Sequence, residues 1–154
     1  MEPDFVIERG NISHLDDIME IENTCFGPDS FSRRQMAYLL TRAKGIFYII
    51  RRKEKVAAYI SLVYRSNASN LRIYSIAVHP SERGRHLAQA LMDQSAAYAG
   101  EMQLSSLTLE VNTQNKAAIS LYTRNGFEID AVLPGYYPDG DAFRMKKLLQ
   151  RQQS

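Results

Sequence analysis

The sequence predicts an α/β fold with a mixed β-sheet, in a single domain that spans residues 1–154. The length favours one domain, because about 150 residues is typical of one. The composition, 45% hydrophobic and 23% charged, is close to that of globular proteins that bury a core. Strand-like and helix-like patterns alternate along the chain, without internal repeats or a linker rich in proline, glycine and serine. We therefore expect a domain that folds on its own.

The first part of the chain is predicted to form one strand and two helices. Residues 5–9 have a strand-like pattern. Ser13 is a plausible N-cap for a helix whose apolar residues recur at helical spacing (Leu15, Ile18 and Met19). A second helix is expected over residues 32–43, with Gly45 placed to end it and three residues facing inward (Met36, Leu39 and Leu40).

Three strand-like stretches follow, at residues 46–51, 56–64 and 71–78. A charged turn at 52–55 joins the first two, and a segment rich in serine and asparagine at 66–70 joins the last two. Short connections of this kind predict an antiparallel meander.

The pattern then changes to strand, helix, strand. The strand at 71–78 precedes a helix at 84–99, whose apolar residues share one face (Leu87, Leu91 and Tyr98), and a strand at 107–111 follows. A crossover helix between two strands implies a parallel pair.

The last part of the chain is predicted to add a shorter helix and two strands. The helix at 115–124 is stopped by Gly126, and strands at 127–133 and 141–148 flank a turn-rich loop at 134–140. The predicted order is therefore β-α-α-β-β-β-α-β-α-β-β.

Charge and hydropathy exclude several classes of protein. Nineteen Lys and Arg against seventeen Asp and Glu leave a net charge of +2, too small for a broad nucleic-acid surface. The longest apolar run, residues 46–50, is far shorter than the ~20 residues of a membrane span. The first twenty residues are acidic where a signal peptide would be apolar. We therefore expect a cytoplasmic protein that requires no nucleic acid and has no membrane partner, and its oligomeric state stays open.

Metal and redox chemistry are not expected. The single cysteine, Cys25, cannot form an internal disulfide. The three histidines have no ligand-like spacing with Cys25 or with one another. We expect neither a metal nor redox activity.

The segment at residues 81–88, S-E-R-G-R-H-L-A, lies between a predicted strand and a predicted helix. Free N–H groups and the positive dipole at a helix N-terminus favour phosphate, and Arg83 and Arg85 add forked cationic donors. The segment therefore indicates a site for a phosphorylated ligand, or alternatively an ordinary charged turn that caps a helix.

Four motifs together resemble the GCN5-related N-acetyltransferase (GNAT) superfamily, over about residues 46–148. They are I-Y-S-I-A-V-H-P from Ile73, R-G-R-H-L-A-Q-A-L-M from Arg83, L-T-L-E-V-N from Leu107, and N-K-A-A-I-S-L-Y-T-R-N-G-F from Asn115. The resemblance implies the GNAT fold, in which a splayed parallel strand pair binds the coenzyme, and acetyl-coenzyme A as the acetyl donor.

The coenzyme signature of this superfamily is R-x-x-G-x-G/A, whose backbone amides take the pyrophosphate. Arg83 and Ala88 match its ends, and the segment between them would contact the coenzyme (Gly84, Arg85, His86 and Leu87). His86 stands where the superfamily usually has glycine. A histidine N–H can still donate to a phosphate oxygen, so we expect the loop to open slightly and binding to survive.

Within the superfamily, the sequence is most similar to N-terminal protein acetyltransferases, including the ribosomal-protein-alanine enzymes. One feature is L-E-V with the tyrosine of S-L-Y-T-R-N-G-F twelve residues after the glutamate. The other is G-Y-Y-P-D-G-D-A-F-R-M-K-K, at residues 135–147.

The resemblance assigns chemistry to two side chains and to the backbone. Glu110, opposite the apolar face of its strand, would be the general base, and Tyr122 would protonate the departing thiolate at the coenzyme sulfur. Asn115, a good N-cap, would touch the coenzyme arm. Backbone amides of a bulged strand would bind the pantetheine and polarise the thioester (Ile76, Ala77 and Val78). The alternatives are a solvated strand charge for Glu110 and a core residue for Tyr122.

The acceptor is expected to lie beside Tyr136 and Tyr137, whose counterparts hydrogen-bond the entering peptide; alternatively they are loop aromatics packed on the sheet edge. The segment at 25–32 would form the other wall, lined by three residues (Phe26, Asp29 and Phe31). Cys25 lacks a matched histidine, so we expect a packed side chain and no acetyl-cysteine intermediate.

Together these residues predict acetylation of the N-terminal α-amine of a protein or peptide, by direct transfer in a ternary complex, with a ribosomal protein as one candidate acceptor. Acetylation of a small-molecule amine (a polyamine, amino acid or antibiotic) stays open as an alternative. So does a non-catalytic module that binds coenzyme A.

Overall fold

The order of strands and helices confirms the predicted α/β arrangement. The computed structural model describes residues 4–149. Its elements are β1 (Val6–Arg9), α1 (Leu15–Phe26), α2 (Arg33–Thr41), β2 (Gly45–Arg52), β3 (Lys55–Val63), β4 (Asn70–Val78), α3 (Leu87–Glu101), β5 (Ser106–Asn112), α4 (Lys116–Arg124), β6 (Glu128–Tyr137) and β7 (Gly140–Leu148). Short 3₁₀ turns lie at Ile12–His14, Gly27–Asp29 and Pro80–Glu82.

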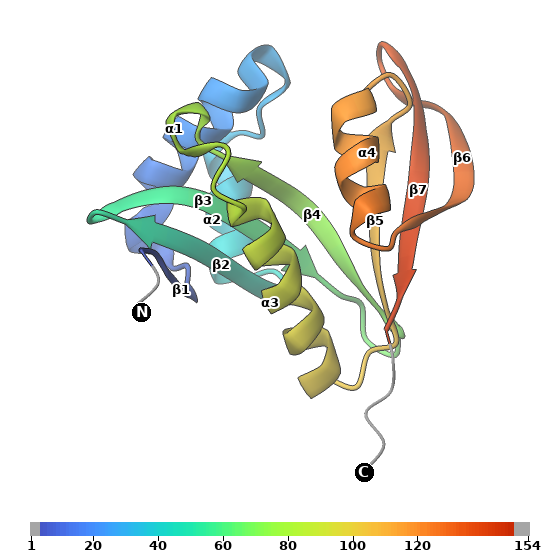
Figure 1. The fold of residues 1–154 in the computed structure, drawn as a ribbon, viewed down its shortest axis with the longest axis horizontal. Helices are drawn as coiled ribbons and strands as arrows, with labels where there is room; N and C mark the ends of the chain where they lie inside the picture. The colour runs from blue at the N-terminus through green and yellow to red at the C-terminus, as the bar shows by residue number, and fades with distance from the viewer. Residues whose placement is uncertain (1–3, 150–154) are drawn as a thin grey trace. The chain divides into compact units, whose positions relative to one another are not determined.

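The strands form one mixed seven-stranded sheet in the order β1-β2-β3-β4-β5-β7-β6 (Figure 1). β4 and β5 are parallel, as the crossover helix predicts, and their register pairs Asn70 with Ser106 and Arg72 with Thr108. β5 and β6 both pair with β7 in the antiparallel sense.

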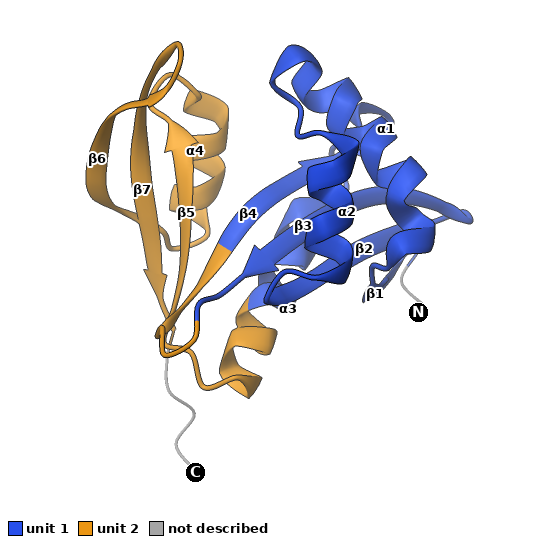
Figure 2. Ribbon diagram, turned by 180° about the vertical axis from the view of Figure 1, so that it is seen from behind, with its two compact units in different colours: residues 1–65, 73–95 blue, residues 66–72, 96–154 orange. Residues whose placement is uncertain are grey.

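The chain divides into two compact units (Figure 2). Unit 1 holds residues 1–65 and 73–95, and unit 2 holds residues 66–72 and 96–154. Both β4 and α3 cross from one unit to the other. That residues 1–154 act as one domain stays a prediction.

Unit 1 is stabilised by helices α1 and α2 packed on β2 and β3. The buried side chains of this core come from both helices and both strands (Leu15, Ile18, Ile21, Met36, Phe47, Ile49 and Tyr59), with Ala77 from β4. Leu39 and Leu40 pack against it and are partly buried, as their helical spacing predicts. Each fully buried aliphatic side chain contributes about 1.5–3 kcal/mol relative to leaving it in water.

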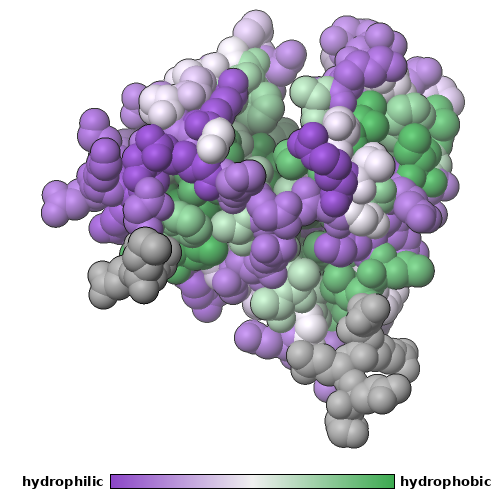
Figure 3. All heavy atoms as spheres, in the orientation of Figure 1, coloured by the Kyte–Doolittle hydropathy of each residue, from purple (hydrophilic) through white to green (hydrophobic). Residues whose placement is uncertain are grey.

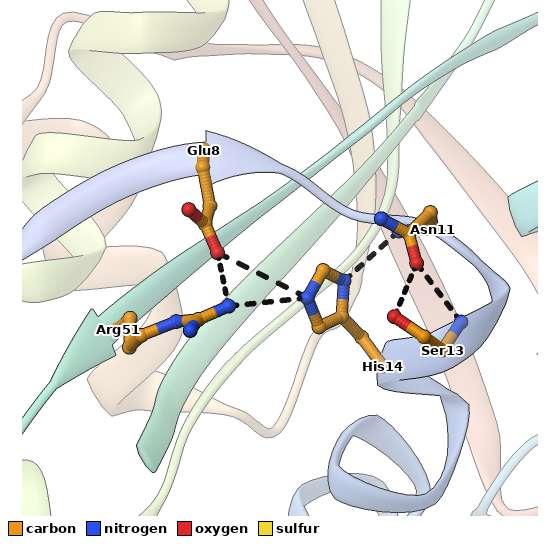
Figure 4. Close-up of polar contacts among 5 residues, drawn as sticks. All are labelled: Glu8, Asn11, Ser13, His14 and Arg51. Atoms are coloured by element: carbon orange, nitrogen blue, oxygen red, sulfur yellow. Dashed lines mark hydrogen bonds and ion pairs between the residues drawn. The ribbon is translucent and has the colours of Figure 1, made fainter. Parts of the chain in front are cut away.

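The start of α1 differs from the prediction that Ser13 is its N-cap. Asn11 caps the preceding 3₁₀ turn instead: its side chain accepts from the Ser13 N–H at 2.9 Å, and His14 Nδ1 accepts from the Asn11 N–H at 3.0 Å (Figure 4). Glu8 on β1 pairs with Arg51 on β2 beside His14. Because the Asn11 oxygen already takes the Ser13 N–H, the turn begins before Ser13 and α1 follows at Leu15.

Gly45 does not end α2, which stops at Thr41, with Ser32 as its N-cap. Gly45 begins β2, where a Cβ atom would lie 1.9 Å from the carbonyl oxygen of Leu62. This glycine is therefore required by the close approach of two strands rather than by a helix end.

The predicted boundaries also change around α3 and β6. α3 begins at Leu87, not at residue 84, because residues 80–86 form turns. Tyr136 and Tyr137 belong to β6, not to a loop. The register shifts between Leu133 and Tyr137, so the segment between them bulges out of β6, and Gly135 there has a φ of +65°.

The surface view shows apolar residues over the edge strand β6 (Figure 3). Ile129 and Val132 of this strand are each about half exposed. None of the helices within residues 4–149 has both the length and the apolar character needed to cross a membrane.

Candidate active site

In unit 1, the turn at residues 80–88 joins β4 to α3, and it has a glycine-like backbone at two positions. Gly84 has a φ of +82° and His86 a φ of +61°. L-residues rarely adopt this left-handed region, which glycine enters freely. His86 therefore keeps the backbone conformation of the glycine that it replaces in the signature, with its ring exposed. The expected widening of the loop stays a prediction.

The N-terminus of α3 fits a phosphorylated ligand. The Ala90 N–H donates to the His86 carbonyl at 3.1 Å. The amides before it, including those of Leu87 and Ala88, have no carbonyl one helical turn earlier to accept from them. Leu87 is buried and anchors the turn, and a Cβ added to Gly84 would meet no atom within 4 Å. Backbone N–H groups in open space at the positive end of a helix suit a pyrophosphate.

The two arginines of the 80–88 turn have different surroundings. Arg85 pairs with Glu82, whose Oε2 also accepts from Nε of the buried Arg52 at 2.7 Å. The hydrogen bond from Arg52 holds the pKa of Glu82 below its ordinary value. Part of the Arg85 charge is thus balanced within the protein, whereas the Arg83 guanidinium contacts Cys25 Sγ at 3.7 Å. Arg83 is the better placed of the two to give its charge to a phosphate.

The strand before this turn alternates between core and partly exposed positions. Ala77 is buried, and Ile76 and Val78 on the opposite face of β4 are half-buried. The Val78 carbonyl accepts from Cys25 Sγ at 3.3 Å. Cys25 thus contacts a backbone carbonyl and an arginine, both in unit 1.

Phe26 ends α1, and the loop that leads from there to α2, also in unit 1, contains the other two residues predicted to face the acceptor. Phe26 and Asp29 are exposed. Phe31 is half-buried, with its ring centroid 5.0 Å from that of Tyr74. The three residues lie within one stretch of the chain, from the end of α1 to the start of α2, as their closeness in sequence requires.

A buried carboxylate that the sequence did not indicate holds this loop. Glu22, only 1% exposed, accepts from the Phe31 N–H at 2.9 Å and from the Tyr59 hydroxyl. Ser30 Oγ donates to the Glu22 carbonyl at 3.1 Å. Burial, and next to it the Glu22 charge, raises the pKa of Tyr59, which stays a neutral donor. The one sequence signal is that Glu22 follows Ile18 by four residues and so shares its buried helix face.

In unit 2, Glu110 lies on β5 beside two arginines. The apolar face of β5 is buried (Leu107, Leu109 and Val111), while the Glu110 side chain is 11% exposed. Its Oε2 accepts from Arg72 Nε at 2.9 Å, and its Oε1 lies 3.8 Å from Arg144 Nε. Arg144 is the register partner of Glu110 on β7. Glu110 is therefore not a solvated strand charge.

Tyr136 joins the same group. Its hydroxyl accepts from Arg72 Nη2 at 3.1 Å, and its ring meets the Tyr137 ring edge-on at 4.9 Å. Burial raises the pKa of Tyr137, and the nearby Tyr136 and Glu110 add to this while Arg72 opposes it. We refer to Arg72, Glu110, Tyr136 and Arg144 as the Glu110 cluster. Arg72 and Arg144 were not identified from the sequence, since only the strand register brings them to Glu110.

Tyr122 lies on α4, which Asn115 caps by accepting the Ala118 N–H at 3.2 Å. The Tyr122 ring is buried and packs edge-on against Phe127, with centroids 5.9 Å apart. Burial, with a smaller effect of Tyr137, raises the pKa of Tyr122 to about 12. Within residues 4–149 no hydrogen bond engages its hydroxyl. The ring thus has a packing role, and the hydroxyl stays protonated at neutral pH, as a proton donor must.

The predicted site residues are divided between the two units. Unit 1 holds most of the coenzyme residues and one part of the acceptor residues (Ile76, Ala77, Val78, Arg83, Gly84, Arg85, His86, Leu87 and Ala88, with Phe26, Asp29 and Phe31). Unit 2 holds the rest (Glu110, Asn115, Tyr122, Tyr136 and Tyr137). In the described part of the chain, no three His, Cys, Asp or Glu side chains are grouped to hold a metal ion. The expected absence of a metal stays a prediction.

Comparisons with known proteins identify the family. Residues 15–127 match the model of the acetyltransferase (GNAT) family. An N-alpha-acetyltransferase of Saccharolobus solfataricus is 26% identical over 158 residues, which covers 95% of this chain and 94% of that protein. An uncharacterised protein of Mycobacterium leprae is 38% identical over 80 residues, or 51% of this chain, and the match spans only 21% of its length.

Solved structures share the fold. The ribosomal-protein-S18-alanine N-acetyltransferase of Escherichia coli superposes with a TM-score of 0.86 at 22% identity, covering 97% of both chains. The family match covers more than half of the sequence, and the strand order and the parallel β4–β5 pair agree with it. The chain therefore belongs to the GNAT family, as an N-acetyltransferase that uses acetyl-coenzyme A.

Proposed function

We propose that this enzyme transfers the acetyl group of acetyl-coenzyme A to the N-terminal α-amine of a protein or peptide. The observation that carries the proposal is the Glu110 cluster, in which the predicted base is linked through Arg72 to Tyr136, a predicted peptide-binding residue. The archaeal relative named an N-alpha-acetyltransferase, which matches almost the whole chain, supports the same acceptor class. A ribosomal protein is one candidate acceptor.

The acceptor chemistry needs only a moderate base. An α-amino group has a pKa of about 7.7–8.0 against about 10.4 for lysine, so a sizeable fraction of the α-amine is neutral near pH 7.5, whereas almost all of the lysine is charged. As the neutral amine attacks the thioester carbon, a C–N bond forms and the C–S bond breaks. Glu110 takes the proton that the amine loses, directly or through water, and the Tyr122 hydroxyl gives a proton to the departing sulfur. Proton exchange with solvent then restores both side chains.

The coenzyme is proposed to bind mainly through backbone atoms. Amides of the 80–88 turn would take the pyrophosphate, with charge from Arg83 and Arg85 and a donor from His86. Amides of Ile76 and Val78, next to Ala77 in β4, would take the pantetheine and the thioester carbonyl. Asn115 would contact the coenzyme arm.

Aromatic and acidic side chains are proposed to contact the acceptor peptide. Tyr136 and Tyr137 would hydrogen-bond its backbone, since Tyr136 belongs to the Glu110 cluster and the Tyr137 ring packs against it. Phe26, Asp29 and Phe31 would contact its first side chains, and Glu22 holds the Phe31 end of this segment.

A non-catalytic module is disfavoured, because Glu110 and a protonated Tyr122 hydroxyl are both retained. Acetylation of a small-molecule amine stays the alternative, and the choice of acceptors in the test distinguishes it.

The test is the initial rate of coenzyme A release with three sets of acceptors. These are peptides with a free N-terminus, the same peptides with a blocked N-terminus and one lysine, and simple polyamines. We expect turnover with the free N-termini alone, and its loss in Glu110→Gln protein. Turnover confined to polyamines would move the enzyme to the small-molecule class, and turnover with the blocked peptides would move it to lysine acetylation.

A further inference from the structure

We infer that Arg52 is a positioning residue for the coenzyme: it balances the charge of Glu82 and so leaves Arg85 available to the pyrophosphate. The inference rests on the part of the proposed function that places the pyrophosphate at the 80–88 turn. Its basis is a group of charged side chains that lies entirely in unit 1.

Glu82 is an acidic side chain within a turn that is proposed to bind an anion. It directly precedes Arg83, the first residue of the coenzyme signature, and its Oε2 lies 3.3 Å from Arg85 Nε. An ionised carboxylate here would repel a pyrophosphate and would compete with it for the Arg85 guanidinium. The Glu82 side chain is 21% exposed, so solvent screens its charge only in part. Phosphate binding at this turn therefore requires a counter-charge for Glu82.

Arg52, the last residue of β2, supplies that counter-charge. Its Nε donates to Glu82 Oε2 at 2.7 Å, and its Nη1 donates to Asp4 Oδ2 at 2.8 Å. The Arg52 side chain is 5% exposed and held by two carboxylates, whereas the Arg85 side chain is 44% exposed. The Arg52 hydrogen bond is also the main reason that the pKa of Glu82 is low, ahead of the charges of Arg85 and Lys53. Arg52 is thus the fixed partner of Glu82, and Arg85 the looser one.

The turn has anchors of its own besides the contact between Arg52 and Glu82. The His79 N–H donates to the Ala57 carbonyl of β3 at 2.9 Å, and the Glu82 N–H donates to the His79 carbonyl at 2.9 Å. Leu87, at the other end of the turn, is buried. Because backbone hydrogen bonds and an apolar side chain already hold the turn on the sheet, we assign an electrostatic role to the Arg52 contact.

Loss of Arg52 should therefore act through Glu82. Without Arg52, the Glu82 carboxylate would pair with Arg85 alone. It would then withdraw that cation from the pyrophosphate and leave an unbalanced negative charge beside it. Loss of Glu82 itself would do neither, since Arg85 would face the ligand without a competitor. A substitution of Glu82 should consequently suppress the effect of a substitution of Arg52.

The test is calorimetric titration of the whole chain and its variants with coenzyme A. Arg52→Gln should raise the dissociation constant about tenfold, and Arg52→Lys should raise it less. Glu82→Gln should give a value at or below that of the wild type. The double variant Arg52→Gln/Glu82→Gln should return to within about twofold of the wild type, because both the cation and the anion are gone. Arg85→Gln removes one cation without freeing an anion, so its effect should be smaller, about threefold to fivefold.

Arg51→Gln is the matched control. Arg51 is the neighbouring residue on β2 and pairs with Glu8, so its substitution breaks an ion pair of the same strand without touching Glu82. Its dissociation constant should stay within about twofold of the wild type. Thermal melting monitored by circular dichroism verifies that each variant is folded. Glu82→Gln breaks the same contact from its more exposed end, so it tests the inference even where Arg52→Gln is unstable.

Coenzyme A carries phosphate at two places, the pyrophosphate and the ribose. The titrations are therefore repeated with dephospho-coenzyme A, which lacks only the ribose phosphate. The effect of Arg52→Gln should persist with this ligand, because the 80–88 turn is proposed to bind the pyrophosphate. Loss of the effect would show that Arg52 acts on the ribose phosphate and would overturn the inference.

The remaining outcomes separate the inference from the proposed coenzyme site. Unchanged affinity in folded Arg52→Gln, equal losses in Arg52→Gln and Glu82→Gln, or no recovery in the folded double variant would overturn the role of Arg52 while the coenzyme site stands. Unchanged affinity in both Arg83→Gln and Arg85→Gln would overturn the placement of the pyrophosphate, and the inference with it.

Discussion

The 80–88 turn of unit 1 and the Glu110 cluster of unit 2 differ in which atoms they offer to a ligand. The turn offers backbone amides at a helix N-terminus, and its shape survives a histidine at φ +61°. The cluster offers side chains from four strands. No backbone group can replace the charge of their carboxylate and guanidinium groups. A site made of amides tolerates changes of side chain, whereas a site made of charged side chains depends on each of them. Substitutions should therefore have large effects in the cluster and small ones in the turn.

The largest effect is expected for Glu110→Gln. The substitution keeps the size of the side chain but removes the base, so kcat should fall by about 10². Coenzyme affinity should hardly change, because Glu110 is not part of the 80–88 turn. Steady-state kinetics and calorimetric titration with coenzyme A measure the two quantities. Unaltered turnover would remove Glu110 from the mechanism.

Tyr122→Phe should also lower kcat, by about 10–10². Burial raises the pKa of Tyr122 to about 12, so the hydroxyl is protonated below that pH and can donate throughout the neutral range. The wild-type kcat should consequently show no alkaline decline attributable to this group up to pH 10. The variant keeps the ring that packs on Phe127 and loses no hydrogen bond seen in residues 4–149, so its melting temperature should be unchanged. A loss of stability with normal turnover would make Tyr122 a core residue alone.

Glu22→Gln tests a side chain of a third kind, one that holds a backbone segment in place through the Phe31 N–H. It weakens the acceptor for the Phe31 N–H and the Tyr59 hydroxyl, so the free energy of unfolding should fall by about 1–3 kcal/mol. The KM for the acceptor peptide should rise more than the KM for acetyl-coenzyme A. Urea unfolding and steady-state kinetics check both. Glu20→Gln is the matched control, since Glu20 is exposed on the same helix; an equal effect of the two substitutions would contradict the role of Glu22.

The smallest effect is expected for His86→Gly. The coenzyme dissociation constant should stay within an order of magnitude, because the backbone already has the glycine-like conformation. Because a side chain is unfavourable in the left-handed backbone conformation of residue 86, its removal should raise the free energy of unfolding by about 1 kcal/mol. Calorimetric titration and thermal unfolding give the two values. A change in affinity much beyond tenfold, in either direction, would show that the imidazole itself decides coenzyme binding.

The sequence predicted local structure well where periodicity carries the signal. Apolar residues recur every three to four positions in helices and every second position in strands. These two repeats predict the order of elements, the parallel β4–β5 pair and the burial of Met36. Two details failed because a neighbour decides them: Gly45 meets the Leu62 carbonyl of the next strand, and Asn11 reaches the Ser13 amide before Ser13 can cap.

The candidate site was predictable only in part, for a related reason. Motifs pointed to Glu110, Tyr122 and the 80–88 turn, because those residues are close in sequence to one another or to a recognisable segment. Arg144 was not predicted, because it lies 34 residues after Glu110 and only the β5–β7 register brings the two together. Long-range ion pairs leave no local pattern.

The most direct test of the central claim is the position of the acetyl group on one peptide that offers two amines. The peptide begins Ser-Glu with a free α-amine and carries a lysine further along, and tandem mass spectrometry locates the modification after reaction with the enzyme and acetyl-coenzyme A. We predict acetyl on the α-amine alone in the wild type, and far less of the same product with Glu110→Gln. Acetyl on the lysine side chain would contradict the claim.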